Sequence, residues 1–353
     1  MTRIRSLAVV LAILLAGAAL AGCGEKSEPA SGASKGDLQP FTVMLDYFPN
    51  ADHAGIYAAQ AAGEYQKAGL DVKIQAPPDP AAPLRLLQAG RADLAISYEP
   101  ELMLARDKGA DLVSVGALVQ KPLTSVMAIA GSGVRRVQDL KGKRVGTAGI
   151  PYQSAYLKTI LQKAGVDPAS VKETNVGFNL VPAMLSRKVD ATLGAFWNYE
   201  GVDLEQRGKR PTIMRMDKLG VPTYAELVLV TRRQQLDEQG ASKVRRFLQA
   251  TARGQQQLQR DPNPGIDALL KANPDLERKL QAAAVKATLP VFLPAEGRPF
   301  GWQDSAQWRA YGDWMSANKL LTRPQNGARA LTNEFLPGEG LDPGVSDSPG
   351  SSY

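Results

Sequence analysis

The chain has 353 residues, 44% of them hydrophobic, and a formal net charge of +7, so it is long enough to bury a core in two lobes. Its lysines and arginines are scattered among acids, with no basic block that carries aromatic residues, which argues against nucleic acid as a partner. One cysteine and one histidine exclude an intramolecular disulfide, a cysteine-ligated metal cluster and a multi-histidine metal site.

Residues 1–22 have the three parts of a secretory signal: basic Arg3 and Arg5, an apolar run over 7–21, and small residues. The apolar run is shorter than the roughly 20 residues of a comfortable membrane span. It ends in LAGC at 20–23, which resembles the lipobox of bacterial lipoproteins, in which the cysteine is lipidated and becomes the first residue after cleavage. We expect lipidation of Cys23; the alternative is an ordinary signal with a chance cysteine.

Two flanking segments have almost nothing to bury. Residues 23–40, from the expected lipid onward, are polar and rich in Ser, Gly and Pro, so we expect a flexible tether there. Residues 338–353 have the same character and predict a disordered tail. The folded unit is therefore expected over 41–337.

Within that unit, short apolar runs alternate with helical patterns, which favours an α/β fold with mostly parallel sheets. Strands are predicted at 41–45, 72–75, 94–97, 112–119, 126–130, 144–148, 171–176, 191–194, 212–216 and 227–231. Helices are predicted at 53–68, 82–89, 99–107, 154–163, 180–187 and 199–206. Pro83 and Pro182 each fit the first turn of a helix.

After residue 235 the pattern becomes almost entirely helical, to about residue 318. This change predicts two α/β lobes, one of which is completed late in the chain. The apolar, extended segments 123–130 and 224–231 are candidates for paired crossover strands between the lobes. We expect lobe one over 41–130 plus 225–337, and lobe two over 131–224.

The loops after the strands carry the aromatic residues. In α/β sheets ligands bind beside the carboxyl ends of the strands, and aromatics are only 6% of the chain, yet nearly every such loop has one. These loops are 46–55, 98–100, 149–154, 196–200 and 222–224. We expect a stacking site between the lobes for a flat, polar, largely uncharged ring. The first four of these loops contain no Arg or Lys, which argues against an anionic ligand.

Ten side chains in these loops are candidate ligand contacts. Rings supply stacking surface, and amide and carboxylate groups orient the ligand by hydrogen bonds; a carboxylate such as Glu200 can accept from an exocyclic amine and a protonated ring nitrogen. The candidates are Asp46, Tyr47, Asn50, His53, Tyr98, Tyr152, Trp197, Asn198, Glu200 and Tyr224.

Each candidate also has a purely structural interpretation. Trp197 and Tyr199 can pack under the sheet, Glu200 can complement a helix dipole, and His53 can hydrogen-bond the loop backbone. In the first loop, Asp52 can cap the following helix, and we expect Phe48 and Pro49 to be structural. The tryptophans of the C-terminal region are expected to pack in the core; these are Trp302, Trp308 and Trp314.

Catalysis finds little support in the chain. There is no Ser-His-Asp order, no cysteine nucleophile in the folded unit and no pair of acid-bearing helices. The segments 131–133 and 141–143 lack the spacing of a phosphate-binding loop. We therefore expect no enzyme activity, no catalytic residue, no metal and no cofactor.

Four segments together carry a family resemblance. They are DYFPNADH at 46–53, GEYQKAGLDV at 63–72, DLKGKRVG at 139–146 and VDATLG at 189–194. In this order, behind a lipobox, they resemble the solute-binding lipoproteins of ABC importers in the group shared with fungal thiamine-pyrimidine synthases. The likeness covers about 41–337.

The resemblance implies a type II periplasmic-binding-protein fold, in which two α/β lobes are joined by two crossover strands and close on a ligand in the cleft. It implies capture of a pyrimidine thiamine precursor, of the formylaminopyrimidine or hydroxymethylpyrimidine type, for delivery to an ABC permease and its ATPase. Riboflavin, or a sulfonate, nitrate or taurine-type solute, is the alternative. We expect a monomer, held by its lipid on the periplasmic or extracellular face of the cytoplasmic membrane, without a nucleic-acid partner.

Two positions depart from the family pattern. The family usually has Trp where this chain has Tyr47, although a tyrosine can also stack. The related synthases carry a cysteine-rich segment before the second crossover, where this chain reads LGVPTYA at 219–225. The missing cysteines argue against synthase activity, and export to a lipid anchor argues against it again.

Overall fold

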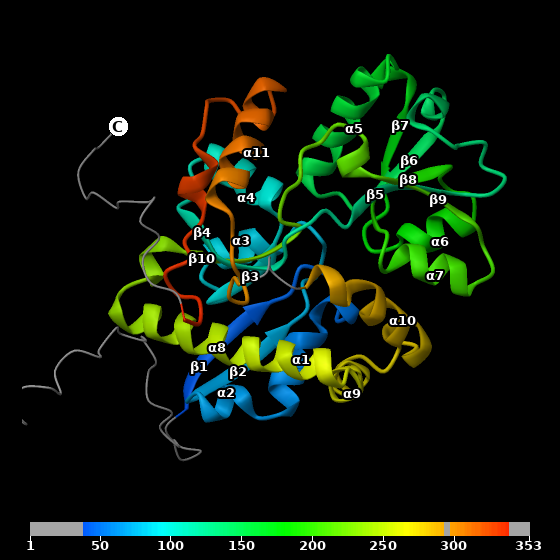
Figure 1. The fold of residues 1–353 in the computed structure, drawn as a ribbon. Coiled ribbons are helices and arrows are strands. Elements are labelled where there is room, and N and C mark those ends of the chain that lie inside the picture. Colours follow the sequence, from blue (N-terminus) through cyan, green and yellow to red (C-terminus); the bar gives the residue numbers. More distant parts are fainter. Residues whose placement is uncertain (1–37, 293–296, 339–353) are drawn as a thin grey trace, which may run out of the picture.

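The computed structural model describes residues 38–292 and 297–338, which form two lobes, each built on its own five-stranded sheet (Figure 1). The first sheet has the order β2-β1-β3-β10-β4 and the second has the order β7-β6-β8-β5-β9. The strands of the first sheet are β1 (Gln39–Met44), β2 (Leu70–Gln75), β3 (Leu94–Ser97), β4 (Leu112–Val119) and β10 (Leu227–Arg232). Those of the second are β5 (Thr124–Ile129), β6 (Arg144–Thr147), β7 (Lys172–Asn175), β8 (Ala191–Phe196) and β9 (Pro211–Arg215).

Both sheets are mixed, with one antiparallel strand each. In the first, β1 pairs in parallel with β2 and β3, whereas β10 is antiparallel to β3 and β4. In the second, β6 pairs in parallel with β7 and β8, whereas β5 is antiparallel to β8 and β9. The antiparallel strand is in each case the first one after the chain crosses from the other lobe.

The chain crosses between the lobes twice: the first crossing leads from β4 to β5 and the second from β9 to β10. These crossings differ from the sequence prediction in two ways. The segments 123–130 and 224–231 do not pair with each other, because β5 and β10 lie in different sheets. The chain leaves the first sheet after β4 and β5 already belongs to the second, so the predicted boundary at 130/131 falls one strand late. An apolar extended segment shows that a strand is buried, but not which sheet buries it.

Two buried carboxylates hold the crossing segments. Glu226 accepts hydrogen bonds from the backbone amides of Leu123 (2.7 Å) and Thr124 (2.8 Å), from the Thr124 hydroxyl (2.8 Å) and from the Tyr224 hydroxyl (3.0 Å). Glu99 accepts from the Ala225 amide at 2.7 Å. The two crossings are therefore joined side by side at one point.

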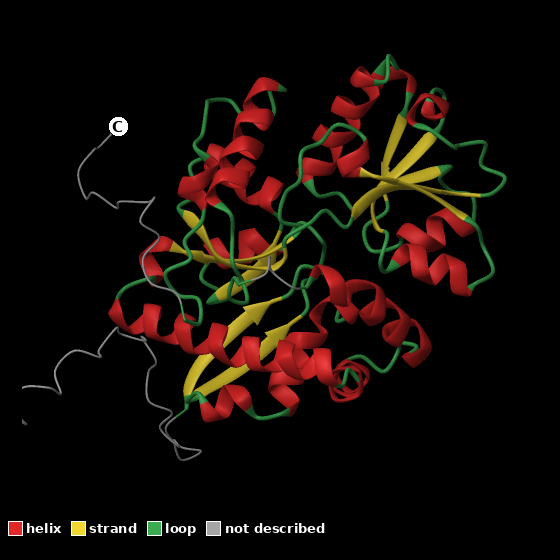
Figure 2. Cartoon of the chain, viewed as in Figure 1, coloured by secondary structure: helices red, strands yellow, loops and turns green. Residues whose placement is uncertain are grey.

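Eleven α-helices cover the sheets within the described residues (Figure 2). They are α1 (Ala54–Ala61), α2 (Glu64–Lys67), α3 (Pro83–Gln88), α4 (Glu99–Asp107), α5 (Pro151–Lys163), α6 (Leu180–Leu185), α7 (Glu200–Gln206), α8 (Glu238–Arg260), α9 (Asn263–Ala272), α10 (Arg278–Thr288) and α11 (Ser305–Ala317). Pro83 begins α3 and Pro182 lies in the first turn of α6, as predicted. The helix predicted over 53–68 is divided, because Gly63 adopts φ +68° between α1 and α2.

The C-terminal helices α8 to α11 belong to the first lobe, where α8 and α9 pack against α1 (Figure 1). Helix α8 passes close to α1 at Gly254, where a Cβ atom would lie 2.4 Å from the Gly55 carbonyl oxygen. Trp308 is fully buried, and Trp302 and Trp314 pack against the same core. The predicted core role is confirmed for Trp308, whereas Trp302 and Trp314 are half-buried at the edge of the core.

Several predictions fall on residues outside the described part of the chain. These are the signal segment 1–22, lipidation of Cys23, most of the tether and nearly all of the tail. No helix within 38–292 and 297–338 is long and apolar enough to cross a membrane.

Candidate ligand-binding site

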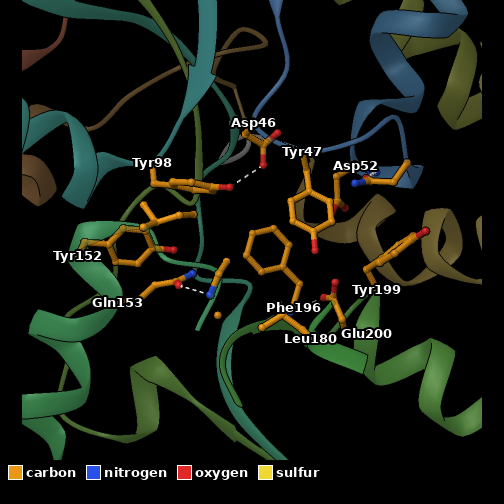
Figure 3. Close-up of a pocket in the computed structure, with 14 residues that line it drawn as sticks. Asp46, Tyr47, Asp52, Tyr98, Tyr152, Gln153, Leu180, Phe196, Tyr199 and Glu200 are labelled. Atoms are coloured by element: carbon orange, nitrogen blue, oxygen red, sulfur yellow. Dashed lines mark hydrogen bonds between the residues drawn. The ribbon is translucent and has the colours of Figure 1, made fainter. Parts of the chain in front are cut away.

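A cavity lies between the lobes, at the carboxyl ends of the parallel strands (Figure 3). Its lining combines tyrosines, carboxylates and apolar groups. The first lobe contributes Asp46, Tyr47, Asn50, Asp52 and Tyr98, and the second contributes Ala148, Ile150, Tyr152, Gln153, Leu180, Gly194, Phe196, Tyr199 and Glu200. Six of the ten predicted contacts are in this set.

Asp46 lies two residues after the end of β1 and is fixed by two neighbours. One of its oxygens, Oδ2, accepts from the Tyr98 hydroxyl at 2.7 Å, and the other lies 2.8 Å from His53 Nε2. The Asn50 amide donates to His53 Nδ1 at 3.2 Å, so Nδ1 is an acceptor and Nε2 carries the proton that it donates to Asp46. His53 is only 1% exposed. His53 therefore does not line the cavity; it orients the Asp46 side chain from the protein interior.

Asn50 caps the short 3-10 helix η1 (Ala51–His53) and also faces the cavity. Its Oδ1 accepts from the Asp52 amide at 2.9 Å, and its Nδ2 donates to the Phe48 carbonyl at 3.1 Å. The cap is thus Asn50 and not Asp52, which leaves the Asp52 side chain available for other contacts.

Asp52 reaches both the cavity and the opposite lobe. It accepts from Asn198 Nδ2 at 2.6 Å and from the Thr288 hydroxyl at 3.3 Å. Burial raises the pKa of this carboxyl to about 6, an effect that Asp46 reinforces and that His53 and the two hydrogen bonds oppose.

Glu200 supplies the carboxylate of the second lobe. It begins α7, is 8% exposed, and accepts from the Phe196 backbone amide at 2.7 Å. Burial raises its pKa to about 8, although the backbone hydrogen bond opposes the shift. The carboxyl can therefore be ionised or protonated near neutral pH, depending on what it faces.

The first turn of α5 supplies Tyr152 and Gln153. Gln153 Oε1 accepts from the Ala148 amide at 2.8 Å, which ties this turn to the end of β6. Gly194 in β8 has φ +115°, and a Cβ there would lie 2.4 Å from Gln153 Nε2. Only glycine leaves room for this amide beside the strand.

Aromatic rings from the two lobes meet around the cavity. Tyr47 packs edge-on against Phe178, with ring centres 4.5 Å apart, and its hydroxyl donates to the Phe178 carbonyl at 2.8 Å. The centre of the Tyr98 ring lies 5.4 Å from that of Tyr152 and 6.4 Å from that of Phe196. These contacts join the lobes, so the structure is a closed form.

Four predicted contacts lie outside the cavity lining. Trp197 points to the first crossing, where its Nε1 donates to the Pro122 carbonyl at 3.1 Å, and the Arg215 guanidinium lies 4.7 Å from its ring. Tyr224 is buried beside the second crossing. His53 and Asn198 act on Asp46 and Asp52, respectively. In this structure all four side chains contact protein groups and do not line the cavity, and their contact with a ligand stays a prediction.

Several lining residues were not among the predicted contacts. The rule that ligands bind beside the carboxyl ends of strands, called here the strand-end rule, had selected the loops that contain Gln153, Phe196 and Tyr199, and also the first loop, which contains Asp52. The rule therefore located these residues without indicating the direction of their side chains. Leu180 follows β7, a strand whose end was not considered. Ala148, Ile150 and Gly194 are small or apolar residues whose positions carry no chemical signal.

The lining favours a donor-rich ring. It contains Asp46, Asp52 and Glu200 but no Lys or Arg, so its electrostatic potential disfavours an anion. Tyrosine faces provide a flat apolar surface, and the carboxylates accept from ring amines. No cluster of three or more potential metal-ligating side chains occurs in the part of the chain that the structure describes.

Comparison with known proteins gives concordant results. The family described as NMT1/THI5 like matches residues 50–264. The formylaminopyrimidine-binding protein of Halalkalibacterium halodurans is 33% identical over 319 residues, which cover 89% of this chain and 95% of that protein. The 4-amino-5-hydroxymethyl-2-methylpyrimidine phosphate synthase of Legionella pneumophila is 27% identical over 299 residues, covering 84% and 92%.

The fold also has solved counterparts. The alkanesulfonate-binding protein SsuA from Xanthomonas axonopodis pv. citri, bound to MOPS, superposes with a TM-score of 0.64 at 20% identity, covering 86% of this chain and 99% of that one. At this identity the likeness establishes the periplasmic-binding-protein fold. The predicted fold class is confirmed.

Proposed function

Because this chain belongs to the NMT1/THI5-like family and has the periplasmic-binding-protein fold, we propose that it is an extracytoplasmic solute-binding protein. Its proposed ligand is a pyrimidine thiamine precursor of the formylaminopyrimidine or hydroxymethylpyrimidine type. The lobes close on this ligand and deliver it to an ABC permease and its ATPase.

The observation that carries the proposal is the lining of the cavity. Asp46 and Asp52 face it from one lobe and Glu200 from the other, among tyrosines and without a cation. An aminopyrimidine is flat and carries amine donors, so it can stack on the rings while a carboxylate accepts from its amine. The relative named for formylaminopyrimidine binding supports this choice of ligand.

Delivery and anchoring extend the proposal beyond the cavity. Cys23 within LAGC is the proposed lipid attachment site, which places a monomer on the outer face of the cytoplasmic membrane. A binding protein with two lobes presents a different surface when closed than when open, and this difference is what a permease can recognise.

The second candidate is an enzyme, because a relative of 27% identity is named as a pyrimidine phosphate synthase. The segment 219–225 before the second crossing contains no cysteine, and the chain has one in total, at position 23. The residues before β10 instead hold the crossing, through Tyr224 and Ala225. This arrangement favours binding over synthesis.

Calorimetric titration tests the proposed function. Hydroxymethylpyrimidine and formylaminopyrimidine are expected to bind saturably, and taurine, an alkanesulfonate and nitrate are not, since an anion would face three carboxylates. Riboflavin serves as the large-ring competitor. Binding of only a sulfonate would contradict the pyrimidine assignment, and formation of product from pyridoxal phosphate and iron would favour the enzyme.

A further inference from the structure

Asn198 makes a buried bridge between the lobes. It lies between β8 and α7, it is fully buried, and its Nδ2 donates to Asp52 Oδ1 at 2.6 Å and to the Thr288 hydroxyl at 2.7 Å. Asp52 belongs to η1 and Thr288 ends α10, so both partners are in the first lobe while Asn198 is in the second. We call these two hydrogen bonds the Asn198 bridge.

We propose that Asn198 is a positioning residue that couples lobe closure to ligand affinity by holding Asp52 in its cavity-facing orientation. The inference rests on the proposed function, because it assumes a ligand between the lobes. Asp52 is the shared element: it lines the cavity and it accepts the bridge. Separation of the lobes breaks both hydrogen bonds at once and frees the Asp52 side chain.

The bridge is incomplete without a further contribution. A carboxylate only accepts hydrogen bonds, so the amide must present Nδ2 to Asp52, and Asn198 Oδ1 is then buried without a partner. A buried acceptor that has lost its water opposes closure. This cost weakens the hold that the bridge has on the lobes of the ligand-free protein, and ligand contact with Asp52 adds to that hold.

The charges around Asp52 give the bridge a pH signature. His53 and Asp46 act on Asp52 from its own loop, and Glu200 interacts with it from α7. Burial raises the pKa of Asp52 and the hydrogen bond from Asn198 lowers it. Without Asn198 this pKa rises further, so Asp52 becomes protonated at higher pH and the acidic limb of the affinity profile moves upward.

The half-buried Gln206 provides a matched control. Its Nε2 donates to the Lys279 carbonyl at 3.2 Å, which also joins α7 to α10 across the lobes. Because this bond is at the surface and touches no cavity residue, Gln206→Ala removes an interlobe hydrogen bond without affecting Asp52. Thr288→Val removes one arm of the bridge and the hydrogen bond from the Thr288 hydroxyl to Asp52, but keeps the bond between Asn198 and Asp52.

The experiment measures hydroxymethylpyrimidine affinity by calorimetry from pH 5 to 9, and the radius of gyration of the ligand-free protein by small-angle scattering. Asn198→Ala is expected to weaken binding about thirtyfold, to move the acidic limb upward and to increase the radius. Gln206→Ala is expected to stay within about twofold of wild type. Thr288→Val removes one of the two hydrogen bonds to Asp52 and is expected to show a smaller loss of affinity and a smaller upward shift of the pH limb. It supplies the answer if Asn198→Ala does not fold.

Unchanged affinity, pH limb and radius in Asn198→Ala would overturn the inference. A loss of affinity without a shift of the pH limb would also overturn it, because that result assigns Asn198 a structural role only. If the wild-type protein binds no pyrimidine, the proposed function fails, and the scattering comparison between wild type and Asn198→Ala still decides whether the bridge holds the lobes.

Discussion

Glu226 at the crossings and Glu200 in the cavity are similarly buried but differently satisfied by protein donors. Four protein donors converge on Glu226 at the crossings, whereas Glu200 in the cavity accepts from the backbone amide of Phe196 and from its own. Burial raises the pKa of both, to about 7 and about 8 respectively. Burial and pKa therefore do not separate a structural carboxylate from a binding one; the donors around it do.

The largest expected effect is on ligand binding at Glu200. Glu200→Gln keeps the shape of the side chain but removes the charge that accepts from an aminopyrimidine, so affinity should fall about a hundredfold, as expected for a charge-assisted hydrogen bond. The free energy of unfolding should stay the same or rise at pH 8, because a buried charge is lost. Calorimetry and thermal unfolding measure the two quantities.

The same substitution at Glu226, at the crossings, should have the opposite effect: a loss of stability larger than the loss of ligand affinity. Glu226→Gln leaves Leu123, Thr124 and Tyr224 competing for a neutral acceptor, one end of which is a donor, and should lower the free energy of unfolding by about 2 kcal/mol. Ligand affinity should change less than in Glu200→Gln. Chemical denaturation at pH 8 checks the first value, and a variant that binds poorly while unfolding normally would reverse the comparison.

The pH dependence of the free energy of unfolding should reflect the buried carboxylates of the cavity and of the crossings together. Burial raises the pKa of Glu99 and Glu200 to about 8, of Glu101 and Glu226 to about 7, and of Asp52 to about 6. A raised pKa means that the folded state binds the proton more tightly than the unfolded chain, so this contribution is complete below the usual glutamate value of 4.5 and is lost as pH rises through about 6–8.

The unfolding midpoint should therefore be higher at pH 6 than at pH 9, by about 5 °C. Scanning calorimetry of the ligand-free protein measures it. The double variant of Glu200→Gln and Glu226→Gln should reduce this difference but not abolish it, because Glu99, Glu101 and Asp52 remain. An equal midpoint at both pH values in the wild type would contradict the assignment.

The strand-end rule located the site from the sequence, and its limits are physical. It placed Asp46, Tyr98 and Glu200 at one cavity, because parallel strands in each sheet end on the same edge. It could not orient Trp197 or Asn198, since the side chains of one loop diverge and each is drawn to partners distant in sequence. The Pro122 carbonyl and Thr288 are such partners, and no local pattern in the loop reveals them.

The prediction of the fold from the sequence was limited in the same way. Alternating strands and helices predicted two α/β lobes, but the membership of β5 depends on β8 and β9, which come later in the chain. Its composition is equally suitable for either sheet. The boundary error of one strand thus arose from long-range pairing, which periodicity does not record.

The smallest expected effect sharpens the comparison within a single loop. Trp197→Phe removes the donor to the Pro122 carbonyl but retains a ring beneath Arg215, so hydroxymethylpyrimidine affinity should stay within about threefold of wild type. Unfolding should be slightly easier, by about 1 kcal/mol, because one hydrogen bond to the first crossing is lost. Three residues further on, Glu200 faces the cavity. A hundredfold loss of affinity in Trp197→Phe would show that the crossing and the cavity are one energetic unit, and the distinction between saturated and available carboxylates would then no longer explain binding.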